Sequence, residues 1–330
     1  MVIVPADPSG MGADIAGMAD QLRAGEAIGA EAGAHLALPA AVVIAGMGGS
    51  AMGGELLRTI VAGDCPVPIT RVRSFGIPGW AGPGTLVVCV SYSGNTAETL
   101  ACARQAHAQG AAILAVASGG ELVELAGELS LPCACVPGGD MQPRAALGYL
   151  FGAMAGAFGA CGLAPEGIAG ECALGVELCD RGAAAQLGER LARTLPLVYG
   201  AGPLGAVAYR WKTQFNENAK MHAFSHAFPE LGHNEIVGWE GANGRGFAIV
   251  ALRDPDEAPE IRRRIDVTLD LVGGQAADVV QVEGRGPTRT ARAFSLVATG
   301  DWVSYHAALA RGVDPTPVDA ITALKNALTD

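Results

Sequence analysis

The sequence predicts an α/β protein with two doubly wound halves, each with a mainly parallel β-sheet flanked by helices. Short apolar runs that carry almost no charge alternate with helical patterns, as expected for parallel strands covered on both faces. The same alternation starts again after residue 194. A chain of 330 residues is also longer than a single hydrophobic core usually supports. We therefore expect two domains, residues 1–165 and 166–330.

The first half contains apolar runs of strand length, separated by helical patterns. The predicted strands are 41–45, 86–90, 111–117 and 131–136. The predicted helices are 51–62, 95–109 and 120–128. Turns from these strands into the following helices lie at the carboxyl edge of such a sheet, where doubly wound proteins bind their ligands.

Residues 145–165 carry no charge and could be mistaken for a membrane span. Gly148, Gly152 and Gly156 repeat the small-xxx-small spacing of packed membrane helices. The segment is rich in Ala and Gly, however, and has few strongly lipophilic residues. We therefore expect a buried helix whose glycine face lets another backbone come close, and no membrane partner.

The second half begins with a polar, Ala-rich helical region at 166–194. The predicted strands that follow are 195–199, 247–252 and 278–282. The predicted helices are 203–215, 257–272 and 289–311. In the second of these helices, apolar residues recur at helical spacing along one face, which is typical of a helix packed on a sheet.

Charge and cysteine content exclude several classes of protein. The formal net charge of −11 argues against a nucleic-acid surface, because phosphate backbones require clustered Lys and Arg. The eight cysteines form no C-x-x-C pair and have no matched His spacing for zinc, so we expect reduced thiols and no metal. The N-terminal residues lack a secretory signal pattern, so we expect a cytoplasmic protein.

Two predicted strand-to-helix turns are suited to binding an anion. The first is glycine-rich and contains Gly48, Gly49 and Ser50; the second, at 91–96, reads Ser-Tyr-Ser-Gly-Asn-Thr. Hydroxyls and backbone N–H groups at a helix N-terminus can hold phosphate without a large cation. The alternative for Ser91, Ser93 and Thr96 is helix capping, but capping needs only one hydroxyl.

A third turn, at 199–205, matches G-x-G-x-x-G between a predicted strand and a predicted helix. Such a turn can bind a dinucleotide, but the full pattern also has an acidic residue closing the next strand about twenty residues on. That distance falls near Met221 and Phe224, in a segment that we expect to be a loop. We therefore keep NAD binding only as an alternative.

The segment 216–235 combines seven titratable side chains with Phe, Pro and Leu, a mixture that indicates a polar site with apolar walls. Its carboxylates and imidazoles suit proton transfer near neutral pH. His222 and His226 are spaced i, i+4, which on a helix could bind a metal, although packing or pocket lining is the simpler interpretation.

Several motifs together resemble the bifunctional phosphoglucose/phosphomannose isomerases, which belong to the sugar isomerase (SIS) superfamily. They are Gly-Met-Gly-Gly-Ser at 46–50, the serine turn at 91–96, Gln-Pro-Arg at 142–144, Asn-Glu-Asn-Ala-Lys at 216–220, Pro-Glu-Leu-Gly-His-Asn-Glu at 229–235 and Asp-Pro-Thr-Pro-Val at 314–318. The resemblance implies two SIS subdomains, a homodimer, no cofactor, and conversion of glucose 6-phosphate or mannose 6-phosphate to fructose 6-phosphate.

The resemblance also implies roles for individual residues. The phosphate-binding hydroxyls match Ser50, Ser91, Ser93 and Thr96, beside Gly48 and Gly49. The catalytic residues match Glu217 as base, Arg144 beside the developing enediolate, His233 for ring opening and Lys325 near the C-terminus. A family threonine near that lysine is assigned to Thr316, with Val318 as the other candidate.

The chemistry of these side chains agrees with the implied roles. Aldose–ketose isomerisation moves a proton between neighbouring carbons, which one carboxylate can do, and a guanidinium can stabilise the enediolate. Taken singly, Glu217, Arg144 and Lys325 are better explained as solvated or ion-paired residues, whereas the motifs taken together favour catalysis. Two other functions remain open: a SIS-type sensor that binds a sugar phosphate without turnover, and an isomerase of pentose or hexulose phosphates.

Overall fold

The computed structural model describes residues 7–241 and 244–328, and its contacts divide the chain into two compact units. The N-unit comprises Ala16–Leu178 and Arg285–Ser295. The C-unit comprises the residues up to Ile15, Cys179–Gly284 and those from Leu296 onward. Both units are therefore discontinuous in sequence. The predicted domains, 1–165 and 166–330, are continuous, and that division stays a prediction.

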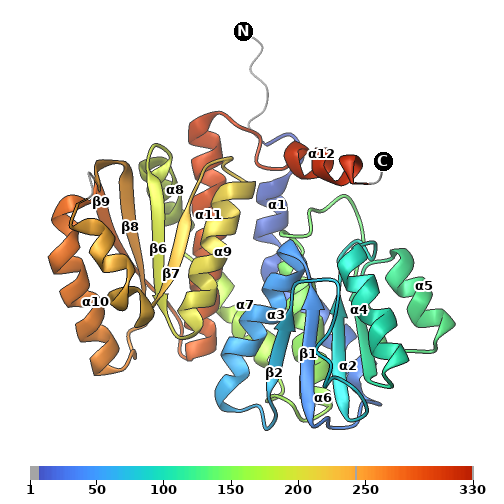
Figure 1. Cartoon of the computed structure of the whole chain (residues 1–330). Helices are drawn as coiled ribbons and strands as arrows, with labels where there is room; N and C mark the ends of the chain where they lie inside the picture. Colours follow the sequence, from blue (N-terminus) through green and yellow to red (C-terminus); the bar gives the residue numbers. More distant parts are fainter. Residues whose placement is uncertain (1–6, 242–243, 329–330) are drawn as a thin grey trace. The chain divides into compact units, whose positions relative to one another are not determined.

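The N-unit is built on a five-stranded sheet in which every neighbouring pair is parallel (Figure 1). Its strands are β1 (Ala41–Gly46), β2 (Ile69–Val72), β3 (Thr85–Val90), β4 (Ala112–Ala117) and β5 (Cys133–Cys135). The strand order is β2-β1-β3-β4-β5. The direction of winding thus reverses between β1 and β3. The paired residues of these two strands, Val42–Gly46 and Leu86–Val90, are all buried.

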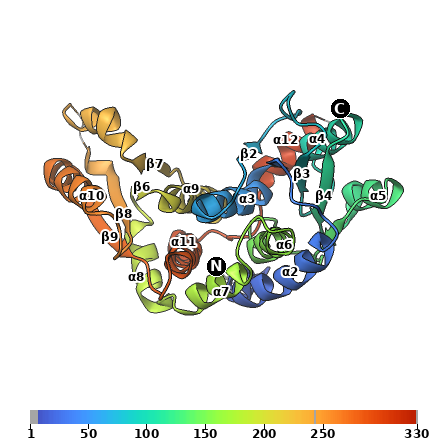
Figure 2. The ribbon, with the colours of Figure 1, turned by 90° about the horizontal axis from the view of Figure 1, so that it is seen from below.

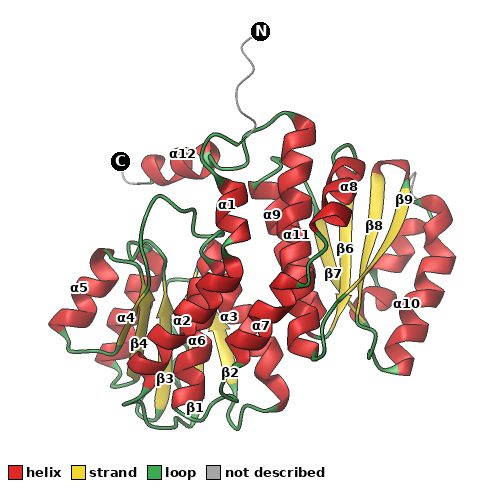
Figure 3. Cartoon of the chain, turned by 180° about the vertical axis from the view of Figure 1, so that it is seen from behind, coloured by secondary structure: helices red, strands yellow, loops and turns green. Residues whose placement is uncertain are grey.

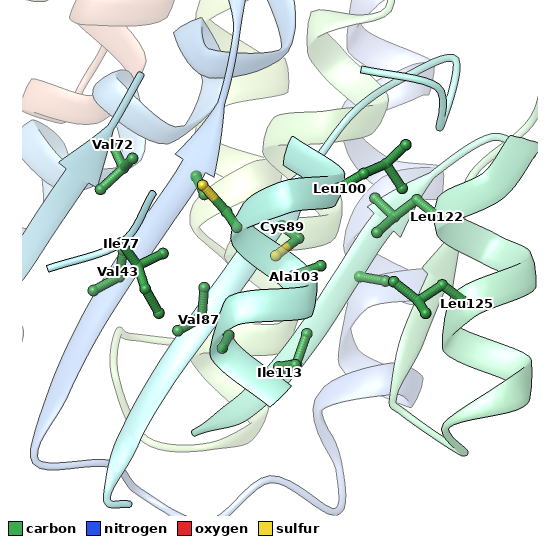
Figure 4. Packing of buried hydrophobic residues seen from close by; sticks show 14 of the residues in the cluster. Val43, Val72, Ile77, Val87, Cys89, Leu100, Ala103, Ile113, Leu122 and Leu125 are labelled. Atoms are coloured by element: carbon green, nitrogen blue, oxygen red, sulfur yellow. The ribbon is translucent and has the colours of Figure 1, made fainter. Parts of the chain in front are cut away.

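Helices cover both faces of this sheet. They are α2 (Met18–Gly33), α3 (Gly48–Ile60), α4 (Ala97–Ala108), α5 (Gly120–Glu128), α6 (Leu147–Ala160) and α7 (Ile168–Glu177). Figure 4 shows Leu100 of α4 and Leu122 of α5 in the same buried hydrophobic cluster as Val43, Val87 and Cys89 of the strands. Helices α2 and α6 lie over the other face of the sheet, as Figure 3 shows in a view from the opposite side of the molecule.

Glycines let α2 and α6 approach to backbone contact. A Cβ added at Gly152 of α6 would lie 2.4 Å from the carbonyl oxygen of Leu22, and one added at Gly29 of α2 would lie 1.9 Å from that of Ala153. The predicted glycine-faced buried helix is therefore confirmed. Among the described residues, no helix is long and apolar enough to span a membrane.

The C-unit contains a four-stranded parallel sheet with the order β7-β6-β8-β9. Its strands are β6 (Leu195–Ala201), β7 (Phe224–Phe228), β8 (Phe247–Arg253) and β9 (Asp278–Glu283). The expectation of a loop around Phe224 was wrong, because Phe224 begins strand β7 and pairs with Leu197. The segment lacks an apolar run because β7 is an edge strand with Phe224 exposed.

The helices of the C-unit are α8 (Arg181–Leu191), α9 (Pro203–Glu217), α10 (Pro259–Val272) and α12 (Asp319–Ala327), with most of α1 (Met11–Ala16) and of α11 (Arg289–Arg311). Figure 2 shows α10 and α11 on opposite faces of the sheet. Ile265 of α10 packs in the core beside Ile249 of β8. A buried ion pair, Arg210–Asp301 at 2.6 Å, joins α9 to α11.

Candidate functional site

The two predicted anion-binding turns lie at the same edge of the N-unit sheet. One follows β1 and leads into α3 at Gly48, and the other follows β3 and leads into α4 at Ala97. β1 and β3 are parallel neighbours at the point where the winding reverses, and the carboxyl ends of such strands are where doubly wound sheets bind ligands. Tyr92 N–H donates to Ser50 Oγ at 3.1 Å and thereby links the two turns.

The serine turn directs hydroxyls toward one another. Ser91 Oγ and Thr96 Oγ1 lie 2.8 Å apart, and Asn95 N–H donates to Ser93 Oγ at 3.3 Å. Thr96 occupies the position that precedes α4, yet its side chain makes no capping hydrogen bond. Capping therefore does not explain Thr96. Ser91 is buried, whereas Ser93 is exposed and Thr96 is partly exposed.

Glycines bring Arg144 next to the first turn. Gly48 has a φ of +52°, which favours glycine. A Cβ added at Gly49 would lie 2.8 Å from the backbone nitrogen of Arg144, so a larger residue would displace one of the two segments. Arg144 is buried, and its Nη1 donates to Gln142 Oε1 at 3.4 Å. The structure thus places a guanidinium-bearing segment against the start of α3.

The corresponding edge of the C-unit, between β6 and β8, is built differently. Gly202 takes a φ of +54°, and Pro203, which has no N–H, opens α9. In the last residue of β8, the Arg253 guanidinium donates to Asp266 at 2.7 Å and to Glu257 at 2.9 Å. Two carboxylates thus already surround the cation at this position.

The dinucleotide alternative required a strand after the G-x-G-x-x-G turn, and β7 supplies one. However, β7 closes on Phe228, not on an acidic residue. The next carboxylate, Glu230, is exposed and accepts a hydrogen bond from Asn234 Nδ2 at 2.9 Å. The segment predicted as a loop is thus partly a strand. The acidic residue that the dinucleotide pattern requires at the end of that strand is still missing.

Glu217 is the last residue of α9 and is partly buried. The following residue, Asn218, is fully buried, and its Nδ2 donates to Ser304 Oγ of α11 at 3.0 Å. Lys220 Nζ donates to the carbonyl oxygen of Glu217 at 2.5 Å. The backbone that carries Glu217 is therefore held on both sides of its helix end.

His233 ends the short 3-10 helix Glu230–His233 and is exposed. Two residues later, Glu235 accepts a hydrogen bond of 2.5 Å from the hydroxyl of Tyr199 in β6. Burial and the neighbouring Glu235 carboxylate raise the pKa of Tyr199, so its hydroxyl stays neutral and can donate. This hydrogen bond ties the segment that carries His233 to the sheet.

Thr316 and Lys325 lie at the C-terminal end of the described chain. Thr316 N–H donates to Asp314 Oδ1 at 2.9 Å in the turn before α12. Lys325 is exposed in the last turn of α12, and every described residue of that helix is exposed.

His222 and His226 do not share a helix. His226 belongs to β7, and the exposed His222 lies in the segment before it, so their i, i+4 spacing does not place them on one helical face. Within 7–241 and 244–328, no group of three or more His, Cys, Asp or Glu side chains could hold a metal ion.

The predicted site residues fall into two sets. The N-unit holds the phosphate set, and the C-unit holds the proton-transfer set apart from Arg144. The phosphate set is Gly48, Gly49, Ser50, Ser91, Ser93 and Thr96. The C-unit residues are Glu217, His233, Thr316 and Lys325. Sequence reasoning missed the hydrogen bonds of Lys220, for which the scarcity of lysine was the only signal.

Comparison with known proteins identifies the family. A profile of the bacterial phospho-glucose isomerase C-terminal SIS domain matches residues 181–328. The bifunctional phosphoglucose/phosphomannose isomerase of Caldicellulosiruptor bescii is 39% identical over 305 residues, which cover 88% of this chain and 89% of that protein. The enzyme of the same name from Thermoplasma acidophilum is 38% identical over 87% of this chain and 89% of its own length.

The chain belongs to the bifunctional phosphoglucose/phosphomannose isomerase family. It is therefore an enzyme of the isomerase class with SIS domains, as its motifs predicted. The fold agrees with this assignment. A putative phosphosugar isomerase from Clostridium difficile 630 superposes with a TM-score of 0.72 at 16% identity, covering 96% of this chain and 97% of that one.

Proposed function

We propose that this isomerase interconverts glucose 6-phosphate and mannose 6-phosphate with fructose 6-phosphate, through ring opening and a cis-enediol(ate) intermediate. The observation that carries the proposal is the hydroxyl cluster at the β1/β3 edge, where Ser91 and Thr96 are 2.8 Å apart. These hydroxyls stand beside two helix N-termini, whose N–H groups and dipoles favour an anion. A phosphate ester is the anion that such a cluster suits.

In the proposed reaction, Glu217 removes a proton from the carbon beside the carbonyl and returns it to the neighbouring carbon. A carboxylate is ionised at neutral pH and can carry out both transfers when it lies within hydrogen-bond reach. Arg144 stabilises the negative charge that develops on the enediolate. His233, assisted by Lys325, moves the proton between the ring oxygen and the C1 hydroxyl.

Both epimers are expected to react at one site. Carbon 2 becomes planar in the enediolate, so the configuration of the starting aldose is lost after proton removal. A pocket that allows rotation about the C2–C3 bond returns the proton to either face. We assign the small residue that leaves this room to Thr316, which lies in the turn before α12.

The alternative function is a SIS-type protein that binds a sugar phosphate to regulate another process, without turnover. The serine turns fit that alternative as well as they fit an enzyme. Glu217 and His233 favour catalysis, because a sensor needs neither a base nor a ring-opening acid. We further propose a cytoplasmic homodimer that uses no cofactor and no metal, on the strength of the family relationship.

A coupled assay on purified protein tests the proposal. We expect turnover of glucose 6-phosphate and of mannose 6-phosphate without added metal, with each substrate inhibiting the other competitively. Binding of both sugar phosphates without turnover would support the regulatory alternative. Turnover of one epimer with simple inhibition by the other would retain an isomerase and refute the bifunctional assignment.

A further inference from the structure

Lys220, three residues after the end of helix α9, has a backbone conformation that is unfavourable for a residue with a side chain. After Glu217, the chain leaves the helix through Asn218 and Ala219, and Lys220 takes a φ of +52°. Met221 N–H then donates to the Phe215 carbonyl oxygen at 3.3 Å, which spans the turn. A left-handed residue at this place in a helix end is usually glycine, since a side chain there is strained.

The strained residue is one of only three lysines, in a chain with 47 glycines. Glycine would accept this backbone conformation without strain, which directs attention to the contacts that the Lys220 side chain makes. The ammonium group donates to the backbone oxygens of two separate segments. Nζ donates to the carbonyl of Glu217 at 2.5 Å and to the carbonyl of Pro315 at 3.2 Å.

These two carbonyls belong to segments far apart in sequence but within the C-unit. The Glu217 carbonyl lies at the negative end of the α9 dipole, which a cation stabilises. Pro315 is buried and immediately precedes Thr316, in the turn that leads to α12 and Lys325. One ammonium therefore joins the helix end that carries Glu217 to the segment that leads to Lys325.

We propose that Lys220 is a positioning residue that holds the Glu217 end of α9 in register with the 314–316 turn. This inference rests on the proposed function, in which Glu217 and Lys325 act on one substrate. Lys220 itself is not assigned a contact with the substrate. Its effect is on geometry, and displacement of a reacting group by about 1 Å can cost roughly a hundredfold in rate.

Two substitutions separate this role from a general effect on stability. Lys220→Met removes both hydrogen bonds and keeps the strained backbone, whereas Lys220→Gly removes both bonds and relieves the strain. We expect kcat to fall roughly 10- to 100-fold in both variants, with KM changed less than about threefold. Lys220→Gly should nevertheless melt at a higher temperature than Lys220→Met. Lys220→Arg, which can still donate, should recover part of kcat.

Lys212→Met is the matched control, because Lys212 lies on α9 near the Tyr209 ring and away from the helix end. We expect its kcat and KM to equal those of the wild type. If Lys220→Gly keeps kcat within about twofold of the wild type, or if Lys212→Met loses as much as Lys220→Met, the positioning role is wrong.

Hydrogen exchange without substrate tests the bridge apart from the reaction. We expect backbone amides in 316–328 to exchange faster in Lys220→Met and Lys220→Gly than in the wild type, and at the wild-type rate in Lys212→Met. Unchanged exchange in the Lys220 variants would overturn the inference even if the enzyme is active. Faster exchange in a protein whose wild type isomerises no sugar phosphate would retain the bridge and reject the proposed function.

Discussion

The two sheets of this isomerase share a winding pattern but place different chemistry at the point where the winding reverses. At the β1/β3 edge of the N-unit, Ser91 and Thr96 present hydroxyls beside two helix N-termini. At the β6/β8 edge of the C-unit, Arg253 is held by Glu257 and Asp266. A guanidinium between two carboxylates has little charge left for a phosphate. The two sheets therefore share the position where the winding reverses, and the turn residues decide what can bind there.

The C-unit carries its proposed chemistry elsewhere, at helix ends. Glu217 closes α9 and Lys325 lies in the last turn of α12. A helix C-terminus repels an anion, so these positions do not suit the phosphate group. In the proposed function, the N-unit hydroxyls bind the phosphate group, and Glu217 and Lys325 of the C-unit move protons.

The largest expected effect is that of Glu217→Gln. The amide cannot accept a proton from carbon, and a positioned general base contributes roughly a hundredfold to ten-thousandfold. We expect kcat to fall by that factor in the coupled assay while fructose 6-phosphate still binds by calorimetry. If the variant keeps more than about a tenth of wild-type turnover, Glu217 is not the base.

The next effect is at the N-unit edge. Thr96→Ala or Ser93→Ala removes the hydrogen bond that we propose to the phosphate group, a loss of about 1.5 to 3 kcal/mol that should appear as a higher KM. Thr59→Ala is the control, because Thr59 Oγ1 bonds the Leu56 carbonyl at 3.0 Å within α3. Equal losses toward phosphorylated and unphosphorylated sugars would show that these hydroxyls do not hold phosphate.

A matched change at the C-unit edge sharpens the comparison. Arg253→Met removes the guanidinium closest to the Glu257 carboxylate, whose side chain is only 6% exposed, and leaves Arg262 at 3.9 Å as the remaining ion-pair partner. We expect a loss of about 1 to 3 kcal/mol in the free energy of unfolding, measured by chemical denaturation. KM for glucose 6-phosphate should stay unchanged at a temperature where the variant is folded. A several-fold rise in KM would mean that this edge also binds the substrate.

The smallest effect is one of selectivity. Thr316→Gln places a longer side chain where we propose that the substrate rotates about C2–C3. We expect kcat/KM for mannose 6-phosphate to fall several-fold more than that for glucose 6-phosphate, since small changes of pocket size are worth about 1 to 3 kcal/mol. Equal losses of kcat/KM for the two epimers would mean that another residue leaves the room for rotation about C2–C3. Val318 would then be the next residue to test.

The central strands and the phosphate turns could be predicted from the sequence because the signals are local. Strands buried on both faces have continuous apolar runs, and the hydroxyls of 91–96 follow one such run directly. The edge strands β2 and β7 were missed, because Thr70, Arg71 and His226 interrupt the apolar pattern. Edge strands need less apolar surface than central ones.

Long-range contacts account for the rest. Helix α2 was not predicted, because its glycines give little apolar signal until they meet α6. Gly25, Gly29 and Gly33 repeat the four-residue spacing of α6 and could have revealed the pair. Gly49 contacts Arg144, and Lys220 contacts Pro315. Each contact joins segments about 95 residues apart, so a local sequence pattern cannot predict it.

Proton exchange with solvent tests the division between binding and chemistry most directly. In D₂O, the wild type should incorporate deuterium at C1 of fructose 6-phosphate, as followed by NMR. Thr96→Ala should reach a comparable rate once the substrate is saturating, because its defect is in binding. Glu217→Gln should incorporate deuterium at least about a hundredfold more slowly than the wild type at every substrate concentration. The opposite result would contradict this division: deuterium incorporation by Glu217→Gln at the wild-type rate, together with slow incorporation by Thr96→Ala even at saturating substrate.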